Sequence, residues 1–545
     1  MKLKIAATAA TLLCCLSCVN QNYELGGNLL PIDQSYSIYY KSLPIPEIYS
    51  MMTDSLPGFS QTSITIGAIR DEHFGLTTRG CALTLVPLYD TLDFGAGPVV
   101  KNFHFSADLD TTDVLYDAHK YILQNIKAYP LKEPVNMKKD LDGNTPVPHL
   151  DESIIKGTAM FNGDDSLSFN FTDEYATKYL SITQEDLEDI DKYLAKFPGI
   201  YIETNEPAGL GGRINRFNLQ LGYDSSDASL SSSYATLTIE TMYDHWDERG
   251  DTTFYFYYSP LEMYDLDSLL TNSSYGSFPQ YCRNYTGHET RDRAGLAKDE
   301  ELEIEGGGGL KPMIKASTLR ALAEQMISEE TSNLDNVVIN RATIVLPFTF
   351  PDDYEDMDFF PYILSPACRL LTDTTATFMG LSDSSDSNEN QGEIDRANLE
   401  FAPDITYHLQ ELLKIKDTDS STYKKYKKGM YDIWFLITAN EVVESGTSSS
   451  SSNELSEYYQ YLAYQSYYSS MYGGGYSSYG NSYSNYYTYM MMAQMYSSSG
   501  TTTSTTQSID VTRYYYGRLN APGYPDKEKV PTLELMFSVP VSDSK

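Results

Sequence analysis

The stretch Leu533-Glu-Leu-Met-Phe-Ser-Val539 places an apolar side chain at every second position near the end of the chain. A period of two is typical of a strand with one buried face. Similar alternation occurs at Ala235-Thr-Leu-Thr-Ile-Glu240 and Thr343-Ile-Val-Leu346, and Phe254-Tyr-Phe-Tyr-Tyr258 is an aromatic run that suits a strand. The sequence therefore predicts a mainly β protein with antiparallel, β-sandwich-like sheets.

A few short helices are expected between the strands. The first should begin after the capping residue Thr183 and end at Pro198-Gly199, with an apolar face made of Leu187, Ile190, Leu194 and Phe197. A second should be capped by Ser317 and bury Leu319, Leu322, Ala323 and Met326. Residues 405–415 form the third candidate. Short helices that bridge antiparallel strands fit this class of fold.

One segment near the C-terminus differs in composition from the rest of the chain. No charged residue occurs between Glu457 and Asp510, although 21% of the whole chain is charged. We interpret residues 445–509, rich in Tyr, Ser, Gly and Met, as a long low-complexity loop inserted in a sheet. It is either a disordered or self-packed loop, or an adhesive surface, because Tyr and Met bury area against irregular partners. The candidate partner contacts are Tyr464, Tyr468, Tyr472, Tyr476 and Met491.

The N-terminus has the pattern of a bacterial lipoprotein signal. Lys2 and Lys4 precede an apolar stretch over residues 5–16, and the small residue Ser17 stands before Cys18. We expect cleavage before Cys18, lipid on its sulfur, and attachment to the outer membrane through that lipid. The alternative is an ordinary secretory peptide or a buried N-terminal helix. The stretch is shorter than the roughly 20 residues that cross a bilayer.

The length of the chain indicates how many domains it forms, and its net charge indicates which classes of partner it can bind. The 545 residues suggest two to four domains. We expect a signal peptide at 1–17, a tether at 18–35, an N-terminal β-rich region at 36–240 and a C-terminal β-rich region at 241–545 that contains the insertion. The formal charge of −36 repels phosphate backbones, which argues against nucleic acid as a partner.

Cysteine and histidine spacing gives no support for a metal site, and we expect neither metal nor other cofactor. Besides Cys18, the mature chain would keep Cys81, Cys282 and Cys368, which allow at most one disulfide, and Cys81 begins an apolar run that predicts burial. The seven histidines form no metal-binding pattern. The segment 386–392 approaches a calcium loop, but its glycine comes one position late and Ala397 replaces the bidentate Glu.

Catalytic signatures are equally weak, so we expect no catalytic residues and a protein that is not an enzyme. The run Gly306–Gly309 lacks the Gly-Lys-Ser/Thr of a phosphate-binding loop, and a turn or a close backbone approach explains it better. The acidic cluster Asp244-His-Trp-Asp-Glu248 follows a strand candidate and should form an exposed loop. A hydrolase that uses these carboxylates is the minority alternative.

The order of several segments resembles a family of Bacteroidota lipoproteins catalogued as domain of unknown function 4270. The matching segments are Gly27-Asn-Leu-Leu-Pro31, Asp54-Ser55, Ile66-Gly-Ala-Ile-Arg-Asp-Glu-His-Phe-Gly75, Glu303-Ile-Glu-Gly-Gly-Gly-Gly-Leu310, Ile339-Asn-Arg-Ala-Thr-Ile-Val-Leu-Pro347 and Pro531-Thr-Leu-Glu-Leu535. The resemblance implies an exported, lipid-anchored, mostly β protein without established catalytic residues. The Tyr/Ser/Met insertion departs from the family pattern. Because residues 19–24 contain one acidic residue, the acidic export tag of surface lipoproteins in this phylum is poor here, and the face of the outer membrane stays open.

Exported proteins of that phylum carry O-glycans at Asp-Ser/Thr followed by a small or aliphatic residue. Such triplets centre on Ser55, Thr91, Thr111, Ser166, Thr252, Ser268 and Thr374, which are our candidate O-glycosylation sites. Glycans would mark exposed connectors.

These observations favour a non-catalytic cell-envelope lipoprotein that works through protein–protein contacts, as an accessory of an outer-membrane protein assembly or transport complex. The alternative is a surface glycan-binding lipoprotein, motivated by 47 tyrosines. With Trp246 and Trp434 as the two tryptophans, the chain has few of the side chains that best stack on sugars.

Overall fold

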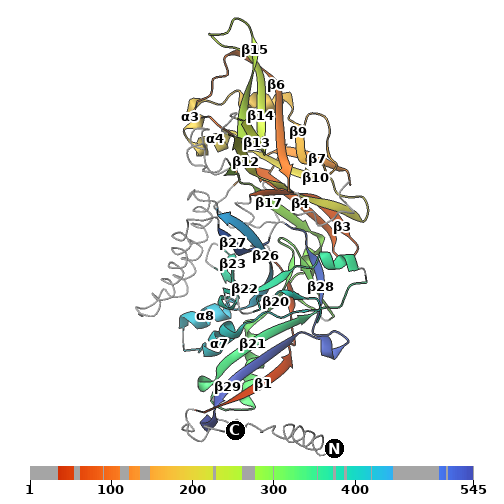
Figure 1. Cartoon of the computed structure of the whole chain (residues 1–545), viewed down its shortest axis with the longest axis vertical. Coiled ribbons are helices and arrows are strands. Elements are labelled where there is room, and N and C mark those ends of the chain that lie inside the picture. The colour runs from red at the N-terminus through yellow and green to blue at the C-terminus, as the bar shows by residue number, and fades with distance from the viewer. Residues whose placement is uncertain are drawn as a thin grey trace, which may run out of the picture.

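The computed structural model describes residues 35–53, 62–89, 91–110, 122–135, 148–224, 229–259, 277–298, 300–352, 354–371, 376–385, 390–418, 420–445, 502–510 and 513–543. Within them the chain is mainly β, every strand pair is antiparallel, and the helices are short. Figure 1 shows an elongated molecule with two groups of sheets, one above the other. The predicted fold class is confirmed.

The upper group, here the N-terminal unit, is organised around a twelve-stranded sheet. Its path is β5-β15-β14-β6-β11-β3-β4-β10-β7-β8, with β9 beside β6 and β17 beside β4. These strands are β3 (Ser63–Asp71), β4 (Gly75–Leu83), β5 (Leu85–Pro87), β6 (Ala96–Leu109), β7 (Gln124–Pro130), β8 (Ala159–Phe161), β9 (Ser166–Asn170), β10 (Ile200–Thr204), β11 (Gly211–Asn218), β14 (Tyr234–Met242), β15 (Gly250–Tyr258) and β17 (Arg283–His288). A small sheet joins β13 (Ser229–Ser232), β12 (Gln220–Asp224) and β16 (Ser277–Pro279).

The lower group, the C-terminal unit, has two larger sheets around a second core. The five-stranded sheet runs β1 (Tyr36–Pro44), β29 (Thr532–Pro540), β21 (Val338–Pro347), β25 (Glu400–Phe401) and β24 (Ile394–Asp395). The seven-stranded sheet runs β18 (Leu296–Ala297), β2 (Tyr49–Met52), β20 (Leu310–Ile314), β26 (Ile433–Ser445), β22 (Ile363–Leu371) and β23 (Ala376–Gly380), with β27 (Thr502–Ile509) beside β26. A two-stranded sheet pairs β19 (Glu301–Glu305) with β28 (Tyr516–Asn520).

The alternation at residues 533–539 decides how the C-terminal unit packs. Leu533, Leu535, Phe537 and Val539 are fully buried, whereas Met536 between them is 36% exposed. The buried side chains share one core with β26, β22, α6 (Ala316–Ser328) and α7 (Thr406–Lys414). Apolar faces of both large sheets and of the two helices thus form a sandwich-like core.

The expected helices are present, with two corrections. Residues 184–196 form two helices, α3 (Gln184–Leu187) and α4 (Ile190–Lys196), because Asp189 caps a second start by accepting from the backbone N–H groups of Asp191 and Lys192. In α6 the N-cap is Lys315, so Ser317 lies inside the helix, and Asp432 accepts from the first helical N–H at 2.8 Å. The prediction for residues 405–415 is confirmed by α7.

Two further helices were not expected. They are α2 (Asp173–Tyr179) and α8 (Ser420–Lys427). The described residues also form short 3-10 helices: η4 (Glu289–Arg293), η5 (Leu334–Asn336), η6 (Tyr354–Asp358), η7 (Ser382–Ser385), η8 (Lys527–Lys529) and η9 (Val541–Asp543).

The two units are not divided at residue 240. Strand β14 runs across that position and pairs with β15, and β17 pairs with β4, so the N-terminal unit continues to His288. Strands β1 and β2 belong instead to the C-terminal unit, where β1 pairs with β29 over nine residues, from Tyr36 with Pro540 to Pro44 with Thr532. The first and last described strands are therefore neighbours.

Candidate functional site

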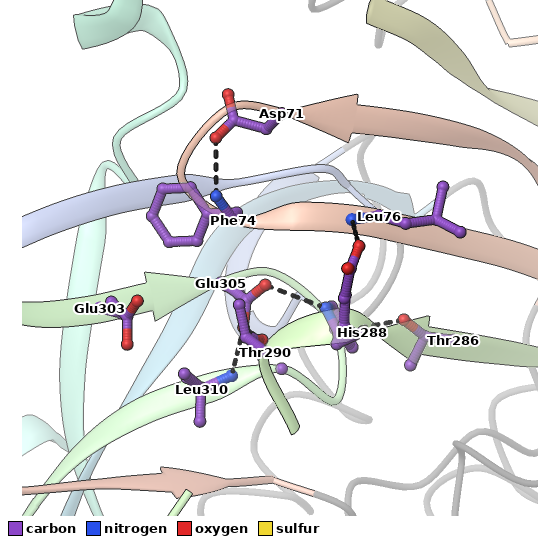
Figure 2. A network of polar contacts seen from close by, with 12 residues as sticks. Asp71, Phe74, Leu76, Thr286, His288, Thr290, Glu303, Glu305 and Leu310 are labelled. Carbon is purple, nitrogen blue, oxygen red and sulfur yellow. Dashed lines mark hydrogen bonds and ion pairs between the residues drawn. The ribbon is translucent and has the colours of Figure 1, made fainter. Parts of the chain in front are cut away.

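Two of the segments that carry the family resemblance meet in space, where the N-terminal and C-terminal units touch. The turn between β3 and β4, residues 71–75, lies against η4 and β19, and the run Gly306–Gly309 connects β19 to β20 (Figure 2). Within the turn, Asp71 accepts hydrogen bonds from the backbone N–H groups of His73 and Phe74 at 2.7 and 2.8 Å. We call this region the joint.

A buried carboxylate, Glu305 at the end of β19, is the centre of the joint. It accepts hydrogen bonds from the Thr290 hydroxyl, from the backbone N–H of Leu310 at 3.2 Å, and from Nδ1 of His288 at 3.3 Å (Figure 2). Burial would raise the pKa of Glu305, but the neighbouring His288 and these hydrogen bonds outweigh burial and lower it. Glu305 is therefore a carboxylate, and its partners come from both units.

Two buried basic side chains, Lys311 and Arg79, lie near that carboxylate. The ammonium of Lys311 donates to the backbone carbonyls of Glu305, Gly307 and Gly309, the last two at 3.2 and 3.4 Å. Burial lowers the Lys311 pKa to about 7, although the charge of Glu305 opposes that shift. Arg79, from β4 of the N-terminal unit, is 3% exposed, and burial lowers its pKa to about 10 against the attraction of Asp510 and Glu305.

The glycine run is required by these charged side chains. A Cβ at Gly307 would stand 2.2 Å from Nη1 of Arg79, and this residue has a φ of +57°. A Cβ at Gly309 would stand 2.5 Å from Cβ of Glu305 and 2.8 Å from Cε1 of His288. Only glycine allows so close an approach in this conformation. The expectation of a turn and a close backbone approach is confirmed.

A second carboxylate, Glu303, holds the other side of the joint. Its side chain is 5% exposed and lies 3.3 Å from Nε2 of His73 and 3.1 Å from Nζ of Lys298. It also pairs with Arg293, which donates a further hydrogen bond to the His73 carbonyl at 2.9 Å. Burial would raise the Glu303 pKa, but the hydrogen bonds from His73, Arg293 and Lys298 prevail and lower it to about 2.

Apolar contacts close the joint beside the ion pairs. Ile69 of β3 forms a buried cluster with Phe359 and Tyr514 of the C-terminal unit. The Phe74 ring lies 5.3 Å from the Tyr516 ring, centroid to centroid, and Phe359 stacks on Tyr516 at 4.7 Å. Such contacts tie the two units together independently of charge.

Three side chains in the joint, here called the polar chain, are linked by hydrogen bonds in the order hydroxyl, imidazole, carboxylate. Thr286 Oγ1 lies 2.7 Å from Nε2 of His288, whose Nδ1 faces Glu305 (Figure 2). That order is also found in nucleophilic triads. Here, however, the side chains of His288 and Glu305 are 1% and 3% exposed, and Thr286 is 6% exposed. Burial lowers the His288 pKa, so its ring is neutral. The arrangement connects the two units and presents no hydroxyl to a substrate.

The acidic cluster Asp244–Glu248 lies where the sequence predicts it, in the connection between β14 and β15. Asp244, His245, Asp247 and Glu248 are exposed. Trp246 packs on Gly250, where a Cβ would stand 2.7 Å from its ring, and its backbone N–H donates to the Tyr243 carbonyl at 2.9 Å. These carboxylates are all exposed, so the loop has the features of a solvated turn.

Several predicted site residues lie outside the described residues. They are Cys18, Ser55, Thr111, Ser268, Thr374, Tyr464, Tyr468, Tyr472, Tyr476 and Met491. The remaining glycosylation candidates are Thr91, exposed between β5 and β6, and Ser166 and Thr252, both half-buried in β9 and β15. The predicted loop at 445–509 is too long at both ends. Ser445 is the last residue of β26, and Thr502–Ile509 form β27, which pairs with β26 from Thr438 with Ile509 to Ser445 with Thr502.

Three features of the described residues bear on the earlier expectations. Cys81, Cys282 and Cys368 are free thiols, all buried, which confirms the prediction for Cys81. Among the residues given above, no group of three His, Cys, Asp or Glu side chains could hold a metal ion. No helix in that part of the chain is long and apolar enough to cross a membrane.

Sequence reasoning missed the joint, although it quoted both segments that form it. A signal was present in Glu301-Leu-Glu-Ile-Glu305, where acidic residues alternate with buried apolar ones directly before the glycines. Glu303 and Glu305 proved to be buried, with cations from distant segments around them. Comparisons of the chain with protein-family models, curated proteins and solved structures gave no match.

Proposed function

We propose that this protein is a non-catalytic component of the cell envelope, anchored to the outer membrane by lipid on Cys18, which works by contact with another envelope protein. The basic start, the apolar stretch and the Ser17-Cys18 pair motivate the anchor. The resemblance to the Bacteroidota lipoproteins motivates a role as accessory of an outer-membrane protein assembly or transport complex.

The burial of the joint is the observation that carries the non-catalytic part of the proposal. The polar chain of Thr286, His288 and Glu305 is the described arrangement that most resembles catalytic machinery, and it lies inside the molecule. The Glu305 carboxylate, with Lys311 and Arg79 near it, lies between the two units and helps to pack one on the other.

Affinity purification tests the proposed partner. The tagged full chain, recovered from detergent-solubilised membranes, should bring down one envelope protein in stoichiometric amount. A variant in which Tyr464, Tyr468, Tyr472 and Tyr476 become Ser should keep the anchor and lose the partner, if the insertion makes the contact. A protein that is solitary under several mild solubilisation conditions would overturn the proposal.

Glycan binding is the second candidate, favoured by an aromatic group at the turn between β14 and β15. The rings of Tyr243 and Trp246 lie 4.9 Å apart, and His245 lies 6.1 Å from Trp246. Trp434, by contrast, is buried beneath Arg369 and Phe378. Binding to a member of a polysaccharide panel that is lost in Trp246→Ala would support this function, and failure to bind any member would dismiss it.

A further inference from the structure

Among the residues that the structure describes, helices cover one face of the five-stranded sheet, and the other face is exposed at its β1 edge. Helix α6 packs on β1 and β29, and α7 packs on β21, all on the side of the core. Lys41 of β1 reaches the end of α6 on that side, with ion pairs to Glu329 and Glu330 at 2.9 and 2.6 Å. The residues that alternate with the buried ones point away from the helices, toward solvent.

The open face carries large apolar side chains at its β1 edge. Tyr36, Ile38 and Tyr40 are 54%, 67% and 59% exposed, at successive outward positions of β1. Tyr40 is in register with Met536 of β29, and Val338 of β21, 49% exposed, is in register with Ser538, as is Ile38. We call these five apolar residues, Tyr36, Ile38, Tyr40, Val338 and Met536, the apolar face.

The chemistry of the apolar face is that of a membrane interface. Tyrosine combines an apolar ring with a hydroxyl that stays hydrated, and it is enriched where protein meets the headgroup layer. The charged neighbours of Tyr40 on this side are Glu534 and Arg341, which have opposite signs. These two charges offset each other beside Tyr40, in a chain whose formal charge is −36. A contiguous exposed apolar surface on a monomer marks an interaction site.

The apolar face also begins close in sequence to the expected anchor. Tyr36, its first residue, follows Cys18 by only 18 positions, which span at most about 60 Å when fully extended. Strands β1 and β29 lie together at one end of the molecule, and β6, β14 and β15 lie at the opposite end (Figure 1). Lipid on Cys18 would therefore hold the β1 end, rather than the β15 end, beside the bilayer.

We propose that the apolar face rests on the bilayer that holds the lipid of Cys18, with Tyr36, Ile38 and Tyr40 in the headgroup layer. The inference rests on the proposed lipid anchor and adds a second, non-covalent contact with the same membrane. That contact fixes which side of the molecule faces the lipid. The surface that remains for a protein partner is then the one away from β1.

Lipid quenching of a fluorophore at position 38 tests this contact. Cys81, Cys282 and Cys368 are buried, so a thiol-reactive, polarity-sensitive dye on the folded, acylated chain will label Ile38→Cys selectively. The protein is reconstituted in vesicles of phosphatidylcholine and phosphatidylethanolamine with nitroxide-labelled acyl chains. Flotation of the vesicles reports anchoring, and quenching of the dye reports contact of the apolar face.

Val99→Cys is the matched control. Val99 is an exposed aliphatic residue on a strand, like Ile38, with 57% exposure, but it lies on β6 at the other end of the molecule (Figure 1). It pairs with Glu240, which binds Lys101 and Arg249 at 2.9 and 3.1 Å. A dye at this position is expected to stay in water.

The expected result is a blue shift and loss of most of the fluorescence at position 38, at a depth of about 5–10 Å, with neither change at position 99. Tyr40→Cys should repeat the result for position 38. If the chain floats with the vesicles but position 38 is not quenched, the inference is overturned while the anchor stands. A blue shift without lipid quenching means that another protein chain covers the apolar face, which also overturns it. A chain that does not float contradicts the anchor itself.

Discussion

Glu305→Ala is the perturbation that most directly measures the joint. The substitution removes the carboxylate that accepts from Thr290, His288 and the Leu310 N–H, and it removes the negative charge that favours the protonated form of Lys311. Removing one partner from a buried charge pair costs about 3–5 kcal/mol. Glu305→Gln keeps the shape and one acceptor oxygen, so we expect a smaller loss of about 1–3 kcal/mol.

Urea denaturation of the purified chain, followed by tyrosine and tryptophan fluorescence, measures these losses. Glu301→Ala is the matched control, because Glu301 lies on the same strand but is 44% exposed and faces Arg518 at 3.4 Å. The loss of stability caused by Glu301→Ala should stay within about 0.5 kcal/mol, as for other exposed ion pairs. If Glu305→Ala costs no more than Glu301→Ala, the buried network does not hold the two units together.

Three other variants of the joint give sharp expectations. Gly307→Ala should destabilise by about 1–3 kcal/mol, because it adds a clash with Arg79 to the strain of a positive φ, whereas Gly157→Ala, with a φ of +81° and open space around it, should show the strain alone. In urea titrations, the free energy of unfolding of wild type minus that of Lys311→Met should rise by about 1.4 kcal/mol per pH unit between about pH 7.5 and 9.5. In this range folded Lys311, with its pKa lowered to about 7, has lost the proton that the unfolded chain still binds. For Glu303→Gln, the difference in the free energy of unfolding from wild type should be largest above about pH 5 and should shrink by about 3 kcal/mol as the pH falls toward 2, because folding lowers the Glu303 pKa to about 2. A difference that does not change with pH would contradict the ion cluster.

The strands could be predicted from sequence because a period of two reports burial directly. Residues 235–240, 343–346 and 533–539 each lie in a strand with an alternating or buried pattern. The helices needed knowledge of tertiary contacts. Asp432, which is far away in sequence, accepts from the first N–H of α6, so the local preference of Ser317 for a cap position was overridden.

The arrangement of the units could not be predicted in the same way. No local pattern indicates that β1 will pair with β29, because that pairing joins opposite ends of the chain. The joint was missed for a related reason. Acidic residues such as Glu305 are mostly exposed, and only the approach of Arg79 and His288 from the N-terminal unit explains its burial.

The lipid anchor on which the proposed function depends is tested most directly by mass spectrometry of the N-terminal peptide from membrane-purified protein. We predict that the mature chain begins at Cys18 and carries acyl chains on that residue. A mature chain that keeps Ser17, or that begins at an unmodified Cys18, would contradict the account.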